Sequence, residues 1–126
     1  MSHRILLVDD ELHILRAAEY KFKRAGYEVL CAFDGEEAWQ VIQRDRPELV
    51  ISDYQMPRLD GLGLVKRIRE CPETASLPVL LLTAKGYDLA RDQQAEQLGV
   101  AAILGKPFSP RELLALTESL LTGTAQ

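Results

Sequence analysis

Residues 5–10 read Ile-Leu-Leu-Val-Asp-Asp, four apolar residues followed directly by two carboxylates. The apolar residues do not alternate with polar ones, which is typical of a strand buried on both faces in a parallel sheet. Three more runs have this character and a fifth, more mixed run suits a sheet edge: Leu49–Ile51, Val79–Leu82 and Ala101–Leu104, and at the edge Tyr27–Ala32. The sequence therefore predicts five strands, four of them covered on both faces.

Helical patterns separate these strands, with apolar residues at intervals of three and four. The first helix carries its apolar stripe at Leu12, Leu15, Ala18, Phe22 and Ala25. We expect the five helices to be bounded by these residues: Leu12 and Gly26, Asp34 and Pro47, Leu62 and Cys71-Pro72, Asp88 and Gly99, and Ser109 and Leu121. The strongest start signal is Ser109 as N-cap, with Pro110 at the first helical position and Glu112 at the third.

Strands that alternate with helices imply a parallel sheet joined by right-handed crossovers. Five strand–helix units are too few for a closed eight-stranded barrel, so the predicted fold is α/β, a (βα)5 doubly wound open sheet. The chain of 126 residues fits a single domain. We assign residues 1–122 to this domain and residues 123–126 to a polar C-terminal tail.

The composition is that of an ordinary globular chain, and its charge argues against a nucleic-acid-binding segment. Nineteen acidic and fifteen basic residues give a net charge of −4. No apolar run approaches the ~20 residues that a membrane span needs, and the N-terminus lacks the features of a signal peptide. Cys31 and Cys71 follow no metal or redox spacing. We therefore expect a cytoplasmic protein without membrane or direct nucleic-acid binding.

The residues that follow the strands form one chemical set. Asp9 and Asp10 follow the first strand, Asp53 the third, Thr83 the fourth and Lys106 the fifth. Ligands of an open α/β sheet bind beyond the carboxyl ends of its strands, so we expect these side chains to converge on one rim. Any one of them could be a turn or cap residue, whereas all five together indicate a functional site.

Three carboxylates within a few ångströms repel one another by roughly 4 kcal/mol per close pair at an effective dielectric constant of 20. Such a cluster either raises the pKa of one member or binds a cation, and an all-oxygen set suits Mg²⁺. One carboxylate is then free to attack a phosphoryl group and form an acyl phosphate. Lys106 would hold the phosphoryl oxygens by charge, and Thr83 would donate a hydrogen bond to one of them.

Five fragments, in matching order and spacing, resemble the receiver domain of two-component response regulators over essentially the whole chain. They are Leu6–Asp10, Asp53–Gly61, Leu82–Ala84, Gly99 and Gly105–Phe108. The resemblance, closest in type to a chemotaxis receiver, implies a flavodoxin-like sheet with strand order 2-1-3-4-5. It also implies a phospho-accepting signalling switch. Such a domain catalyses its own phosphorylation and dephosphorylation and is otherwise not an enzyme.

The resemblance implies a role for each residue of the acidic site. Asp53 resembles the phosphoacceptor, and Asp10 resembles the direct metal ligand. Asp9 would assist through water, and the backbone carbonyl of Gln55 would complete the protein ligands. The implied metal is Mg²⁺, with Mn²⁺ as an alternative.

Thr83 and Lys106 resemble the residues that sense and bind the phosphoryl group, and Lys106-Pro107 resembles a cis peptide bond of the family. Ile103 is the one clear departure, because many members carry Tyr or Phe three residues before the lysine. In those relatives the ring turns inward when the threonine moves. Isoleucine is stiff at χ1, so we expect a smaller rearrangement here, with phosphorylation itself unaffected.

The partners implied by the resemblance are a phosphoryl donor and a receiver of the signal. The donor would be a histidine kinase, a histidine phosphotransfer protein or a small phosphodonor. The signal would reach a downstream partner protein or a fused output domain. Whether this is a free-standing receiver or the first domain of a longer regulator stays open at this stage.

Three other readings fit the residues less well. A haloacid-dehalogenase-type, Mg²⁺-dependent phosphohydrolase needs a second aspartate two residues after the nucleophile, where this chain has Gln55. A flavodoxin-like cofactor binder would meet repulsion between Asp9-Asp10-Glu11 and the cofactor phosphate. No GxxxxGK[ST] motif is present, which excludes a nucleotide-binding P-loop. An interaction module whose phosphorylation changes partner choice remains compatible with the switch.

Overall fold

The computed structural model describes residues 3–56, 58–83, 89–105 and 109–122. Within these ranges five strands alternate with five helices, and each element lies close to its predicted position. In chain order they are β1 (Arg4–Val8), α1 (Leu12–Arg24), β2 (Glu28–Ala32), α2 (Gly35–Asp45), β3 (Leu49–Asp53), α3 (Gly61–Glu70), β4 (Val79–Thr83), α4 (Leu89–Gln97), β5 (Ala102–Gly105) and α5 (Pro110–Thr122).

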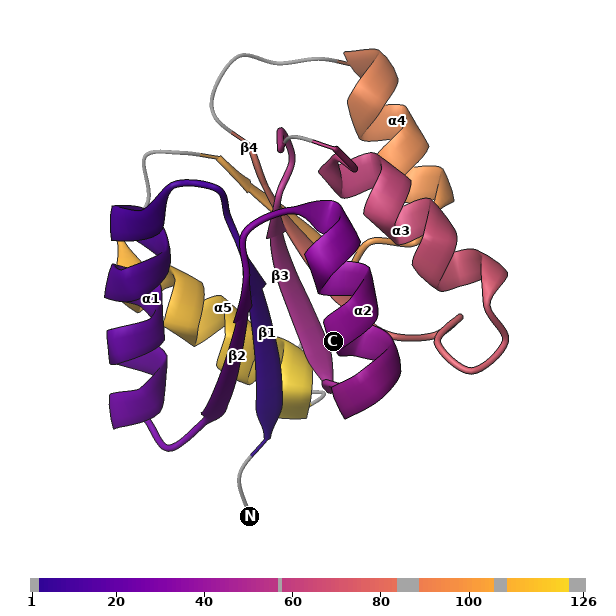
Figure 1. Cartoon of the computed structure of the whole chain (residues 1–126). Helices are drawn as coiled ribbons and strands as arrows, with labels where there is room; N and C mark the ends of the chain where they lie inside the picture. Colours follow the sequence, from indigo (N-terminus) through magenta and orange to yellow (C-terminus); the bar gives the residue numbers. More distant parts are fainter. Residues whose placement is uncertain (1–2, 57, 84–88, 106–108, 123–126) are drawn as a thin grey trace.

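The described strands form one parallel sheet in the order β2-β1-β3-β4-β5, which confirms the predicted α/β fold class and strand order. Helices α1 and α5 cover one face of this sheet, and α2, α3 and α4 cover the other (Figure 1). The central strands β1 and β3 are adjacent, so their carboxyl ends meet at the middle of one edge of the sheet. This arrangement positions the candidate site.

Alternate residues of each central strand serve two separate hydrophobic clusters. Leu6 and Val8 pack in the cluster under α2, α3 and α4, whereas Ile5 and Leu7 pack in the cluster under α1 and α5. Each strand must therefore be apolar on both faces, which explains the unbroken apolar runs. Trp39 packs against the first cluster, as a core residue of α2 would.

Two predictions about burial were wrong. Ala101–Leu104 was expected to be covered on both faces, but β5 lies at the sheet edge and alternates between half-buried and exposed residues. Ala102 and Leu104 pack toward α1 and α5, whereas Ile103 points away from that cluster and is 37% exposed. Leu12, which begins α1, is 51% exposed, and Ala25 follows the last helical residue and is also exposed.

The helix starts agree with the capping signals in the sequence. The Glu37 amide donates to Asp34 Oδ1 at 2.8 Å, which caps α2. At α5 the Glu112 amide donates to Ser109 Oγ at 3.1 Å, and the Ser109 amide donates to Glu112 Oε1 at 2.9 Å. This reciprocal pair is the capping box that the sequence predicted. None of the helices that the described residues form has the length and apolarity needed to cross a bilayer.

Candidate functional site

Three carboxylates meet where β1 and β3 end. Asp9 and Asp10 follow directly after β1, and Asp53 is the last residue of β3. One oxygen of each lies within 4.8 Å of the corresponding oxygens of the other two. Asp9 and Asp53 are 3% and 5% exposed, whereas Asp10 is exposed to solvent. Adjacent parallel strands thus bring together the three acidic residues that the sequence predicted to converge.

Backbone amides hold the two buried carboxylates in place. The Glu11 amide donates to Asp9 Oδ1 at 2.9 Å, and the Tyr54 amide donates to Asp53 Oδ1 at 2.9 Å. Each amide comes from the first residues of the loop that follows the strand, so the same turn that ends the strand also orients its carboxylate. Hydrogen bonds of this kind favour the charged form of the acid.

The donor set fits a small divalent cation. All three side chains offer oxygen, which Mg²⁺ prefers, and three carboxylates this close repel one another unless a cation or a proton lies between them. Exposure of Asp10 leaves one side of the cluster open to water, and Mg²⁺ usually keeps several water ligands. These observations make Asp9, Asp10 and Asp53 a candidate metal site.

The loop that follows Asp53 is fastened at both ends. The Tyr54 amide donates to the Leu82 carbonyl at 2.8 Å, and the Gly61 amide donates back to the Tyr54 carbonyl at 2.8 Å. Gln55, the predicted source of a carbonyl ligand, lies exposed in this loop. Asp60 ends the loop and caps α3 by accepting from the Gly63 amide at 2.8 Å.

Thr83 ends β4, beside the strand that carries Asp53. The register pairs Asp53 with Leu82 and Thr83 with Gly105, so Thr83 stands at the same rim of the sheet as the carboxylates. Its side chain is half-buried. Lys106 and the Lys106-Pro107 peptide bond lie outside the described residues, so the predicted ammonium and the predicted cis bond stay predictions.

The sequence analysis did not anticipate the contribution of Tyr54. Its amide serves both the Asp53 carboxylate and the Leu82 carbonyl, and its side chain is buried in the core beneath the loop. No sequence signal could have identified this role, because every residue other than proline offers the same backbone donor.

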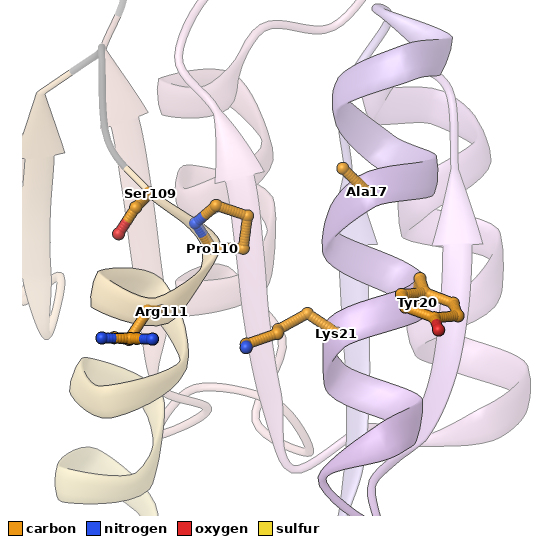
Figure 2. A pocket seen from close by; sticks show the side chains of 6 residues that line it. All are labelled: Ala17, Tyr20, Lys21, Ser109, Pro110 and Arg111. Carbon is orange, nitrogen blue, oxygen red and sulfur yellow. The ribbon is translucent and has the colours of Figure 1, made fainter.

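A separate hollow of about 540 Å³ lies between α1 and the start of α5 (Figure 2). Its walls come from two elements and include two cationic side chains, and the lining residues are Ala17, Tyr20, Lys21, Ser109, Pro110 and Arg111. None of the three carboxylates lines it, so this hollow is separate from the acidic cluster.

Residues 5–118 match the family model described as "Response regulator receiver domain". The chain belongs to this family. It is a receiver domain of two-component signal transduction, as the sequence fragments indicated.

Relatives of this receiver domain include transcriptional regulators. It is 43% identical over 121 residues to "Probable transcriptional regulator ycf27" of Cyanophora paradoxa, covering 96% of this chain and 49% of the relative. It is 38% identical over 121 residues to the alkaline phosphatase synthesis transcriptional regulatory protein PhoP of Bacillus subtilis, covering 96% and 49%. The chain thus spans about half the length of these curated relatives.

Solved structures agree with the fold. The chemotaxis response regulator CheY4 of Vibrio cholerae superposes on the receiver domain with a TM-score of 0.86 at 33% identity, covering 94% of this chain and 98% of that one. Coverage this complete on both sides means that the two chains share the same five-stranded architecture from the first strand to the last helix.

Proposed function

We propose that this receiver domain is a phosphorylation switch that accepts a phosphoryl group on Asp53 and then changes the surface it offers to a partner. One observation carries the proposal, the cluster of Asp9, Asp10 and Asp53 at the carboxyl edge of the sheet. Carboxylates held this close together suit a bound cation and a negatively charged phosphoryl group beside it.

The reaction is a transfer between two side chains. A carboxylate oxygen of Asp53 attacks the phosphorus atom of a phosphohistidine on the donor protein. The new O–P bond forms an acyl phosphate, the P–N bond breaks, and the released imidazole nitrogen takes up a proton. The amide of Tyr54 orients the Asp53 carboxylate for this attack by its hydrogen bond to Oδ1.

Asp9, Asp10 and Asp53, with the backbone carbonyl of Gln55, are the groups that would hold Mg²⁺ or, alternatively, Mn²⁺. When bound, such a cation supplies positive charge that stabilises the phosphoryl oxygens during transfer. Asp10, as the exposed member, is the assigned direct ligand, and the buried Asp9 acts through water. Water that enters the same site later hydrolyses the acyl phosphate and resets the switch.

Thr83 is the assigned sensor of the phosphoryl group, because it ends β4 at the rim beside β3. Lys106 is assigned to the phosphoryl oxygens by charge. Ile103 takes the place of the ring that many family members carry. It is already exposed on the edge strand, so it adds little new surface whichever way Thr83 moves.

The partners follow from the family. The donor is a histidine kinase or histidine phosphotransfer protein, and the signal passes to a partner protein or to an output domain beyond the receiver. The receiver domain itself is assigned to residues 1–122, ahead of a short polar tail. Relatives named as transcriptional regulators favour control of transcription. The net charge of −4 favours DNA contacts outside this segment. Two free thiols, Cys31 and Cys71, favour the reducing cytoplasm as its compartment.

The decisive test is phosphorylation by a small donor. Incubation with acetyl phosphate and Mg²⁺ should add one phosphoryl group, labile to hydroxylamine, that intact-mass spectrometry detects. Asp53→Asn should abolish the added mass, because an amide cannot form the acyl phosphate and the nearly isosteric change leaves the fold intact.

Asp60→Asn is the matched control. It removes the same charge from the same loop, and asparagine caps a helix about as well as aspartate, so phosphorylation should proceed normally. Phosphate found on a serine or threonine, or an unaltered mass gain in Asp53→Asn, would refute the assignment.

A further inference from the structure

The backbone of the loop that follows Asp53 lies directly against the start of α2. Gly35 is the first residue of this helix and is buried. A Cβ placed on Gly35 would lie 2.7 Å from Leu59 Cβ and 2.8 Å from the Leu59 carbonyl carbon, and closer still to the Leu59 carbonyl oxygen. Two of these three atoms belong to the main chain, so no rotation of a side chain could make room.

The conformation of the loop fixes where Leu59 comes to lie. Arg58, the residue before it, adopts a left-handed backbone with φ of 70°, which is uncommon for a residue other than glycine. The side chain of Leu59 packs against the core under α2 and α3. At the far end of the loop, the Gly61 amide donates a hydrogen bond to the Tyr54 carbonyl. In this conformation the backbone of Leu59 lies directly against the bare α-carbon of Gly35.

We propose that Gly35 is a positioning residue for phosphoryl transfer: its lack of a side chain lets Leu59, in the loop that follows Asp53, lie against the start of α2, and this contact fixes the Gln55 carbonyl and the Asp53 carboxylate relative to Asp9 and Asp10. The inference rests on the proposed function. This role adds to the site a residue at the start of α2 that would contact neither the metal ligands nor the phosphoryl group.

Gly63 on α3 offers an internal contrast, because it contacts the same residue of the loop, Leu59. A Cβ on Gly63 would lie 2.7 Å from Leu59 Cδ1, the end of a side chain that can rotate away. Alanine is also a better helix former than glycine, at both Gly35 and Gly63. Loss of function in Gly35→Ala with retention in Gly63→Ala would therefore report on the backbone contact and not on helix propensity.

The experiment measures the Mg²⁺ dissociation constant by calorimetry for the wild type, Gly35→Ala and Gly63→Ala, with circular dichroism to verify folding. Residues that orient metal ligands typically contribute factors of 10 to 100 to affinity, so Gly35→Ala should weaken Mg²⁺ binding about tenfold or more. Gly63→Ala should stay within about twofold of the wild type on the same reasoning. Adding Leu59→Ala to Gly35→Ala should not restore binding, since the obstructing Cβ and carbonyl remain.

A second pair of variants tests the same contact between the loop and α2 without changing a residue of α2. Arg58 is exposed, and both Arg58→Val and Arg58→Asn remove its charge. Asparagine tolerates a positive φ and should preserve Mg²⁺ affinity, whereas β-branched valine disfavours it and should shift the loop and weaken binding. If Gly35→Ala does not fold, this pair decides whether the position of the loop against α2 affects Mg²⁺ binding.

The phosphorylation switch and the positioning role of Gly35 are refuted by different results. If the wild type neither binds Mg²⁺ nor takes up a phosphoryl group, the proposed function is wrong. If the wild type does both, and folded Gly35→Ala and Arg58→Val bind Mg²⁺ as tightly as it does, the positioning role of Gly35 is wrong.

Discussion

Burial sets the chemistry of Cys31 on β2. Its thiol is packed against the cluster under α1 and α5, and this desolvation raises the pKa of Cys31 to about 11, with the nearby Glu19 carboxylate adding to the effect. The thiol form is therefore favoured by folding. Stability from this group is present below the ordinary thiol pKa of about 9 and is lost as the pH rises through about 11.

Cys31 should consequently be inert to alkylation at neutral pH. In a Cys71→Ser background only Cys31 remains, and at pH 8 roughly one thiol in a thousand is ionised when the pKa is about 11. Iodoacetamide should modify the folded protein far more slowly than the same protein in urea. Equal rates in the two conditions would show that the thiol is not buried as described.

Individual residues also show how far sequence reasoning reaches. Asp9, Asp10 and Asp53 were predicted to converge, because the alternation of strands and helices fixes which strand ends share an edge. The exposure of Leu12 was not predictable in this way, since periodicity gives the face of a helix but not how far its neighbour extends. Gly35 left no signal either, because a backbone that lies on a glycine is a long-range contact.

At the scale of elements, one guanidinium ties α3 to the end of α4. Arg69 Nε donates to the Leu98 carbonyl at 2.6 Å, and its Nη2 donates to the Gly99 carbonyl at 3.1 Å. Nη1 donates to the carbonyls of Leu77 at 2.6 Å and Ala75 at 3.1 Å. These bonds hold the C-terminal end of α4 and the segment before β4 to the same helix.

This anchor and Ile103 together predict a limited response of α4 to phosphorylation. A beryllofluoride–Mg²⁺ complex compared with the apo form should show no displacement of α4 as a body, with the change concentrated in the loops after β3 and β4. Crystal structures or amide chemical shifts of the two states would measure this. A large inward swing of Ile103 with a shift of the whole of α4 would contradict it.

Arg69→Lys tests whether the Arg69 hydrogen bonds are the cause of the small displacement expected for α4. Lysine keeps the charge but loses the planar fork that reaches four carbonyls, so the shift of α4 on beryllofluoride binding should grow. Arg67→Lys is the matched control on the same helix, because Arg67 pairs only with the Glu36 carboxylate on α2 among the described contacts. An unchanged α4 response in Arg69→Lys would leave Ile103 as the sole cause.

The order of the elements was more predictable than their exposure. The capping box of Ser109 and Glu112 is a local pattern, and it appears where the sequence placed it. Burial of β5 on both faces was expected from its apolar residues alone and was wrong, because an edge strand has fewer neighbours to cover it. The more mixed composition of Tyr27–Ala32 correctly indicated the edge position of β2, but the apolar run of β5 gave no such indication.

At the scale of the whole molecule, repulsion among the three clustered carboxylates favours binding of a cation by the folded state. Mg²⁺ that binds only the native state should therefore raise the unfolding midpoint. At a concentration one hundred times the dissociation constant, the gain is about 2.7 kcal/mol, or about 10 °C for a domain of this size. A thermal melt followed by circular dichroism measures this shift.

Asp10→Ala should remove most of that shift, and without Mg²⁺ it should stabilise the domain by relieving repulsion. Glu73→Gln serves as the control, since it deletes one negative charge from an exposed pair with Arg46 far along the chain. A melting curve that does not respond to millimolar Mg²⁺ in the folded wild type would refute the acidic-site proposal.

The strand order has a consequence for how the chain is made. β1 emerges first from a ribosome, β2 pairs on one side of it, and β3 pairs on the other. β4 then adds beside β3, and β5 adds beside β4. Every newly synthesised strand meets an edge that is already free, and none must be inserted between partners already paired. Asp53 is the last carboxylate of the acidic cluster in the chain, so a nascent chain already contains every carboxylate of the site before β4 is synthesised.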